Sequence, residues 1–263
     1  MGFKCGIVGL PNVGKSTLFN ALTASKNAEA ANFPFCTIDP NIGIVDVIDT
    51  RLDQLSKLSN SKKKIYTNIT FVDIAGLVKG ASKGEGLGNK FLSHIREVDA
   101  IIHLVRCFES DKITHVSSKI DPVEDLETIK TEIILSDIDV IQKKLDKGKK
   151  KLLDETEIKI LEEKLEQLNQ GLEIKINDEK ENKFLSSLGL LSIKPRIIVC
   201  NVDEESLAKG NALTESVKNK HSVEKIVTIC ADIEDQIMGL DNNERETFMK
   251  EIGLNKTGLN QLI

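Results

Sequence analysis

The sequence lacks any apolar run long enough to cross a membrane. A transmembrane helix needs about 20 consecutive apolar residues, and no run in this chain approaches that length. The chain also has no charged and apolar leader with a cleavage site, because residues 1–5 lead directly into an apolar strand pattern. We therefore expect no membrane partner and no leader segment.

Cysteine pairs and a surplus of positive charge are missing as well. The five cysteines are odd in number and widely spaced, without a Cys-x-x-Cys pair, so they favour neither a disulfide framework nor a metal site. Four lie in or beside apolar runs, as buried thiols do, whereas Cys36 is either a reactive thiol or an inert loop residue. The 36 basic and 41 acidic residues give a net charge of -5. We therefore expect no DNA partner, and any other polyanion needs a local basic patch.

Short apolar runs that alternate with helical patterns indicate an α/β fold. The runs are bounded by Gly, Asp or Asn, as buried strands are, and they lie at 5–9, 42–47, 69–72, 100–105, 196–200 and 226–230. Strands that alternate with helices form a mainly parallel sheet with helices on both faces. The alternative is an α+β layer without such crossovers.

The strand pattern stops between residues 121 and 194. Asp121-Pro122 is typical of a helix start. Two series of apolar residues then recur every three or four positions, which predicts two antiparallel helices packed as a coiled coil. The series are Ile134, Ile138, Ile141 and Leu145, and Ile158, Leu161, Leu165, Leu168 and Leu172. We therefore divide the chain into a first domain part at 1–120, a helical insertion at 121–194 and a second domain part at 195–263.

A lysine cluster lies between the two predicted helices. Residues 143–151 contain six lysines, with Gly148 as the turn residue. A basic tip on a long hairpin suits the recognition of a polyanion such as RNA. The cluster is equally compatible with a solvated helix face.

Residues 9–16 read Gly-Leu-Pro-Asn-Val-Gly-Lys-Ser and match G-x-x-x-x-G-K-[ST] between a strand and a helix. The backbone N–H groups of such a loop cradle phosphates at a helix N-terminus. Lys15 is expected to neutralise the β- and γ-phosphates during catalysis, and Ser16 to hold Mg²⁺. The other loop residues predicted to bind nucleotide are Asn12, Val13, Gly14 and Thr17.

Two further segments are predicted to complete the phosphate and Mg²⁺ site. Asp73 follows the strand at 69–72 and is expected to hold Mg²⁺ through water, while the Gly76 N–H contacts the γ-phosphate. Thr37 is the candidate hydroxyl that joins the Mg²⁺ shell when triphosphate is bound, and an ordinary loop residue is the alternative. The glycine-rich stretch 80–88 is the predicted second switch segment.

The tetrad Asn201-Val202-Asp203-Glu204 stands after the strand at 196–200, where a GTP-binding domain carries Asn-Lys-x-Asp. An Asp in the last position accepts two hydrogen bonds from guanine. Glu204 is one methylene longer and argues against GTP, because a site built around a hydrogen-bonded edge discriminates strongly. Since Glu204 supplies no adenine contact, we expect the Val202 backbone and the N–H of Ala231 or its neighbour to contact the base.

Together these motifs resemble the YchF / Obg-like ATPase family of translation-factor-class P-loop NTPases. The resemblance rests on the sequences at 9–17, 32–41, 73–89 and 201–204 and extends through nearly the whole chain. It implies a P-loop NTPase G domain with an inserted α-helical coiled-coil arm, ATP preferred over GTP, and a cytoplasmic location. It also implies a ribosomal partner (rRNA or ribosomal protein) and a C-terminal TGS domain, which is usual in the family but absent from this 263-residue sequence.

The resemblance also bears on hydrolysis. Leu77 stands where Ras-like proteins carry the glutamine that orients the attacking water, and leucine forms no hydrogen bond to water. The resemblance points instead to His115 as a mobile catalytic residue, with an exposed loop histidine as the alternative. Asn12 matches an asparagine that helps K⁺ to bind beside the phosphates in related NTPases. The functions left open are an ATP-driven ribosomal switch, a conventional GTPase, and an NTP-gated adaptor with slow hydrolysis.

Overall fold

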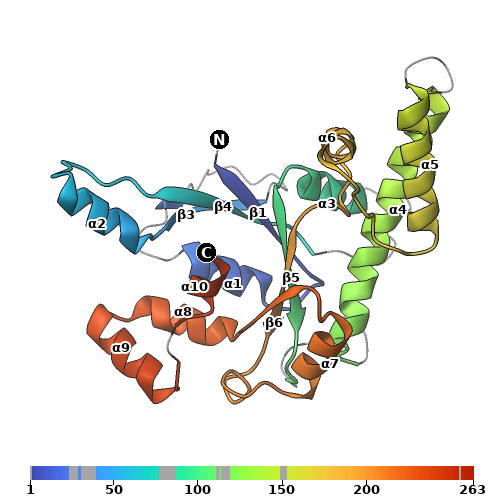
Figure 1. Cartoon of the computed structure of the whole chain (residues 1–263). Helices are drawn as coiled ribbons and strands as arrows, with labels where there is room; N and C mark the ends of the chain where they lie inside the picture. The colour runs from blue at the N-terminus through green and yellow to red at the C-terminus, as the bar shows by residue number, and fades with distance from the viewer. Residues whose placement is uncertain are drawn as a thin grey trace.

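The computed structural model describes residues 2–23, 29–30, 40–76, 87–110, 113, 119–148, 153–254 and 256–263. Within them a seven-stranded sheet has the order β2-β3-β4-β1-β5-β6-β7 (Figure 1). The strands are β1 (Phe3–Val8), β2 (Glu29–Ala30), β3 (Asn41–Val47), β4 (Thr67–Asp73), β5 (Ala100–Arg106), β6 (Arg196–Asn201) and β7 (Lys225–Ile229). Neighbours from β4 to β7 run parallel, whereas β3 is antiparallel to both β2 and β4. The predicted mainly parallel α/β sheet is confirmed.

Helices cover both faces of this sheet. Successive strand residues point to opposite faces, and β5 has six consecutive buried residues while β6 has four. Buried apolar side chains reach the sheet from α1, α3 and α7, among them Leu18, Ile95 and Val217. The helices outside the insertion are α1 (Lys15–Thr23), α2 (Thr50–Leu58), α3 (Leu87–Arg96), α7 (Ala212–Lys220), α8 (Ala231–Gly239), α9 (Asn242–Glu251) and α10 (Leu259–Leu262).

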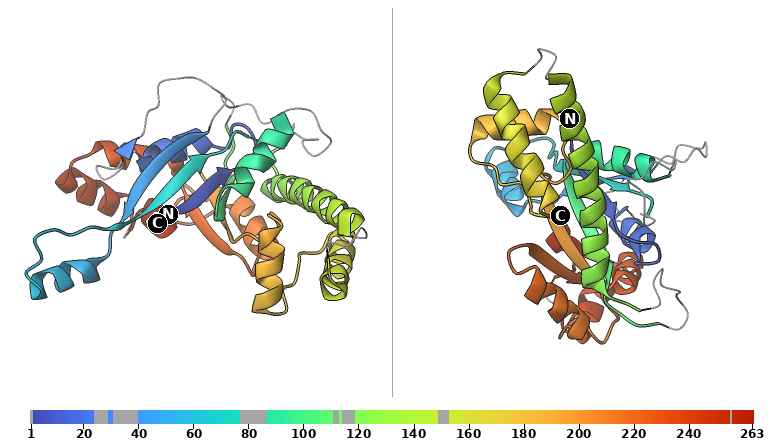
Figure 2. Two further views of the ribbon diagram at one scale, coloured as in Figure 1. Left: turned by 90° about the horizontal axis from the view of Figure 1, so that it is seen from above. Right: turned by 90° about the vertical axis from the view of Figure 1, so that its right-hand side faces the viewer.

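A helical arm stands at one side of the sheet, with α4 (Pro122–Gly148) and α5 (Glu155–Asn169) side by side (Figures 1 and 2). As predicted, α4 begins at the Asp121-Pro122 signal, where the Asp121 carboxylate accepts from the N–H groups of Val123 and Glu124 at 3.1 Å. The predicted apolar seam also forms, with Ile134, Ile138, Ile141 and Leu145 of α4 in one cluster with Ile158, Leu161, Leu165 and Leu168 of α5.

The structure differs from the predicted hairpin in two respects. Leu172 lies beyond the end of α5 and is 52% exposed, so it is not part of the seam. A third helix, α6 (Glu179–Ser187), follows, and its Leu185 packs into the arm cluster. Its start is capped by Asp178, whose carboxylate accepts from the Glu181 N–H at 2.8 Å. The missed signal was this Asp followed three residues later by a Glu.

The first half of α4 belongs to the packing of the sheet rather than to the arm. Ile129 and Ile133 lie in the main core cluster, and Leu126 lies in the cluster that contains Ile198 of β6. One continuous helix therefore passes from the core into the arm. The arm is therefore attached to the sheet through a single helix of 27 residues.

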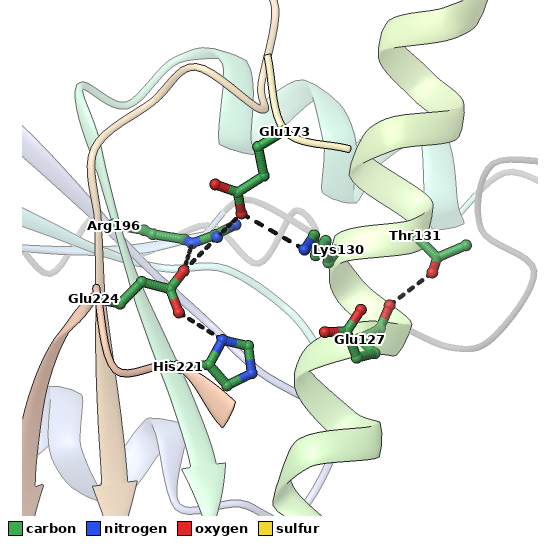
Figure 3. Close-up of polar contacts among 7 residues, drawn as sticks. All are labelled: Glu127, Lys130, Thr131, Glu173, Arg196, His221 and Glu224. Carbon is green, nitrogen blue, oxygen red and sulfur yellow. Dashed lines mark hydrogen bonds and ion pairs between the residues drawn. The ribbon is translucent and has the colours of Figure 1, made fainter. Parts of the chain in front are cut away.

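Ionic contacts also join the arm to the sheet (Figure 3). Arg196, the first residue of β6, pairs with Glu173 after α5 and with Glu224 before β7. Oε1 of Glu173 lies 3.6 Å from Nζ of Lys130 on α4, and Oε2 of Glu224 lies 2.6 Å from Nδ1 of His221. The network connects α4, β6 and the start of β7.

The described residues test only part of the sequence predictions. Cys5, Cys107, Cys200 and Cys230 are buried free thiols, as predicted. No helix in the described part of the chain is long and apolar enough to span a bilayer. Outside the described residues lie Cys36, Thr37, Leu77, His115, most of the glycine-rich stretch and the basic residues 149–151.

Candidate nucleotide-binding site

The loop between β1 and α1 has the shape of a phosphate-binding loop. Asn12 has a φ of 63° and Gly14 a φ of 97°, so the backbone turns through the left-handed region twice in three residues. A Cβ at Gly14 would stand 2.4 Å from Nδ2 of Asn201, and a Cβ at Gly9 would stand 2.5 Å from the Leu104 carbonyl oxygen. Glycine is therefore required at both motif positions, at Gly14 by conformation and by space and at Gly9 by space.

Lys15 is held inside this loop as a buried cation. Its Nζ donates to the Leu10 carbonyl oxygen at 2.7 Å, and a Cβ at Gly76 would lie 3.0 Å from the same Nζ. Burial lowers the pKa of Lys15 to about 8, and the nearby Asp73 carboxylate opposes this shift. A polyphosphate placed against Nζ would favour the ammonium form in the same way. Lys15 and Gly76 therefore come together, as the sequence predicts.

The two predicted Mg²⁺ residues are also brought together. Ser16 Oγ, at the start of α1, donates to Asp73 Oδ2 at the end of β4 over 3.3 Å. Burial raises the pKa of the Asp73 carboxyl group, while Lys15 and Ser16 oppose this rise. A desolvated carboxylate beside a hydroxyl group is the set of hard oxygen ligands that Mg²⁺ binds, together with water and phosphate oxygens. The residues present therefore fit the ion.

Asn201 ties the phosphate loop to the opposite wall of the site. Its Nδ2 donates to the Val13 carbonyl oxygen at 3.0 Å, and its Oδ1 accepts from the Ala231 N–H at 3.0 Å. Asn201 is only 4% exposed, so both hydrogen bonds are shielded from water. Asn201 therefore connects its own loop after β6 with the phosphate loop at Val13 and with the loop after β7 at Ala231.

These contacts bear on the expected donors to the base. The Ala231 N–H is bonded to Asn201, and the Val202 N–H donates to the Ile229 carbonyl oxygen at 2.8 Å. Neither group is available to donate to a base. In this structure the Ala231 N–H thus supports the site through Asn201, which the sequence could not show. The predicted alternatives, the N–H of the residue next to Ala231 and the Val202 carbonyl group, stay predictions.

A cavity of about 380 Å³ adjoins these loops, which is within the usual range for small-molecule sites. Of the predicted residues it is lined by Asn12, Gly14, Thr17, Asn201, Val202 and Glu204. Asp232, which follows Ala231 in the predicted base segment, lines it as well. The lining residues that sequence reasoning missed are Phe108, Glu109, Ser110, Ile113, Ile233 and Gln236. The available signal for the 108–110 segment was its position just after β5, since ligands bind at the carboxyl ends of parallel strands.

Comparison with known proteins agrees with this geometry. The family model described as 50S ribosome-binding GTPase matches residues 4–143. "Ribosome-binding ATPase YchF" of Bacillus subtilis is 47% identical over 275 residues, which cover 100% of this chain and 75% of the relative. The chain belongs to the YchF family. Its relative of the same name in Escherichia coli O157:H7 is 47% identical, covering 100% and 74%, and that in Mycoplasma genitalium is 48% identical, covering 99% and 74%.

The solved structure of the Schizosaccharomyces pombe YchF GTPase has the same fold. It aligns with a TM-score of 0.82 and 33% identity over 99% of this chain and 74% of the yeast chain. The YchF relatives are named as ATPases, whereas this yeast protein is named as a GTPase. The names therefore do not decide which base this YchF chain accepts.

Proposed function

We propose that this YchF chain is a Mg²⁺-dependent ATPase that acts as a nucleotide-driven switch on the ribosome. The observation that carries the proposal is the assembly of Lys15, Ser16 and Asp73 beside a nucleotide-sized cavity that ends at Asn201 and Glu204. The names of the relatives support both ATP hydrolysis and ribosome binding.

The phosphate end of the site binds and orients the triphosphate. The loop N–H groups at the start of α1 donate hydrogen bonds to the phosphate oxygens, and the Lys15 ammonium group neutralises their negative charge. Ser16 and Asp73 would hold Mg²⁺, Asp73 through water, and the Gly76 N–H would face the γ-phosphate. Bound Mg²⁺ would neutralise charge that develops on the phosphate oxygens. Thr37 completes the proposed ligand set.

The base end of the site favours ATP by excluding guanine. Glu204 lines the cavity in the position where guanine binding requires the shorter Asp. Because the N–H groups of Val202 and Ala231 are already bonded, adenine gains no donor from them. A conventional GTPase is the second candidate, since the family model and the yeast structure carry that name.

We assign water activation to His115, the residue that the family resemblance indicates, since the Leu77 side chain has no polar group to orient a nucleophile. His115→Ala should lower turnover with ATP while the dissociation constant for ATP stays within about twofold, since the histidine would act on the water and not on the ground state. Asn12 supports a K⁺ ion beside the phosphates. Equal turnover in KCl and NaCl would contradict that part of the proposal.

The ribosome is the proposed partner, with the cytoplasm as the place of action. The long arm projects away from the sheet (Figure 1). The six lysines at 143–151 are the proposed local basic patch that a polyanion partner needs. The alternative is an NTP-gated adaptor that binds RNA and hydrolyses slowly.

Turnover measured with and without purified ribosomes separates these possibilities. A switch should show strongly stimulated ATP hydrolysis when ribosomes are added. Unchanged slow turnover together with nucleotide-dependent ribosome binding would favour the adaptor. Failure to pellet with ribosomes in any nucleotide state would contradict the ribosomal assignment.

A further inference from the structure

Arg106 is a buried arginine whose side chain bonds to the backbone of residues that line the cavity near the base tetrad. It is the last residue of β5, is 1% exposed, and is among the largest fully buried side chains in the described part of the chain. Its Nε donates to the Phe108 carbonyl oxygen at 3.0 Å, Nη1 to that of Ile113 at 2.9 Å, and Nη2 to that of Ser110 at 3.4 Å. All three acceptor residues line the cavity of about 380 Å³.

The guanidinium group holds this segment through more than one kind of contact. Its central carbon lies 4.7 Å from the centre of the Phe108 ring, in the range of a cation–π interaction. No carboxylate forms an ion pair with Arg106 among the described residues. In the part of the chain that the structure describes, backbone carbonyl groups and one aromatic face surround the buried charge and stabilise it.

The rigid fork of arginine suits this task. Three carbonyl groups spread over residues 108–113 are reached in different directions by Nε, Nη1 and Nη2. A lysine ammonium group is a compact point charge on a flexible stem and lacks this fixed geometry. Arg106 therefore fixes the positions of three carbonyl groups after β5 and does not merely add positive charge.

The opposite side of the same segment is bonded to the asparagine of the base tetrad. The Cys107 N–H donates to the Asn201 carbonyl oxygen at 2.7 Å, and Nδ2 of Asn211 donates to the Cys107 carbonyl oxygen at 2.7 Å. The backbone of Cys107 is thus held by Asn201 and Asn211, while the backbone of residues 108, 110 and 113 is held by the Arg106 side chain. The wall of the cavity and the tetrad are connected directly.

We propose that Arg106 is a positioning residue of the nucleotide site, which holds residues 108–110 and 113 as the wall of the base cavity. This inference rests on the proposed function, in that the cavity is taken to receive the base of a nucleotide. Arg106 touches the backbone of the wall and not the phosphate loop, so it should act on the part of the affinity that comes from the base. Lys15 and Ser16 should bind phosphates equally well without it.

The test compares a ligand that has a base with a ligand that has none. The dissociation constants of Mg²⁺-ATP and of Mg²⁺-tripolyphosphate are measured by calorimetry on the full chain for wild type, Arg106→Lys and Arg106→Met. We expect ATP binding to weaken about tenfold or more in Arg106→Met and less in Arg106→Lys, with tripolyphosphate binding unchanged. A purely structural role would weaken both ligands in parallel.

Arg245 provides a matched control, because its Nε also donates to a backbone carbonyl oxygen, that of Ile237 at 3.2 Å, and neither residue lines the cavity. Arg245→Met should change neither affinity. If Arg106→Met does not fold, Arg106→Lys carries the comparison. Equal loss for both ligands, or no loss for ATP, overturns the inference. If the wild type binds neither ATP nor GTP, the proposed function itself fails.

Discussion

We expect the contributions of Gly14 and Asn201 to the free energy of unfolding to be coupled, because they meet in the same loop contact. An alanine at position 14 would need a φ near 97°, which costs about 1–2 kcal/mol for a residue with a Cβ. Its Cβ would also stand 2.4 Å from Nδ2 of Asn201 and would displace that side chain. The displacement would break the bonds to the Val13 carbonyl oxygen and the Ala231 N–H.

The size of this second cost follows from the two buried groups left without a partner. Each unsatisfied group costs about 1–3 kcal/mol, so the loss of both is worth about 2–6 kcal/mol. Asn201→Ala should produce this loss alone. Gly14→Ala should produce it together with the backbone strain, for a total of about 3–8 kcal/mol.

A double-mutant cycle tests the reasoning. In the Asn201→Ala background the amide is gone, so Gly14→Ala should cost only the strain of about 1–2 kcal/mol. Free energies of unfolding from urea titrations should therefore show a coupling of at least about 2 kcal/mol between the two positions. Additivity within about 0.5 kcal/mol would refute the account, because it would show that the two sites do not share the same hydrogen bonds.

Three further predictions concern the charges and the base. Glu204→Asp should raise the affinity for GTP by about tenfold or more relative to ATP in calorimetry, and an unchanged ratio would contradict the role of that side chain. Because burial lowers the pKa of Lys15 to about 8 and the ammonium form binds phosphates, ATP affinity should fall as the pH rises through about 8, a step that Lys15→Met should lack. The stability of the nucleotide-free protein should depend on pH in the opposite direction. Between about pH 8 and 10.5 the unfolded chain, whose Lys15 has a pKa of 10.5, binds more protons than the folded chain, so the free energy of unfolding should rise with pH. Replacing the tip lysines at 147, 149, 150 and 151 by alanine should weaken ribosome pelleting and flatten its salt dependence, whereas a solvated turn would leave both unchanged.

The sequence was sufficient for the parts of the fold that depend on burial pattern. The strand runs, the start of α4 at Asp121 and the seam between α4 and α5 follow from apolar periodicity, and the structure reproduces them. The phosphate loop was predictable because the motif at 9–16 requires a glycine at position 14. The structure shows why, since Gly14 has a φ of 97°. In each of these cases the local pattern and the tertiary packing require the same residue types.

The base end could not be predicted in the same detail, because its chemistry depends on which backbone groups remain free. Nothing in the sequence near Ala231 shows that its N–H is bonded to Asn201, a residue 30 positions away. The role of Arg106 was hidden for a similar reason, since a strand-end arginine is usually exposed and this one is buried under its own loop. Helix α6 was missed because its short apolar pattern resembles a loop.

The central claim is that the site accepts ATP and discriminates against GTP. Calorimetric titration of both nucleotides, with Mg²⁺, against the same preparation tests it most directly. The account predicts tighter binding of ATP than of GTP. Equal affinities would contradict it, and tighter binding of GTP would contradict it and favour the conventional GTPase.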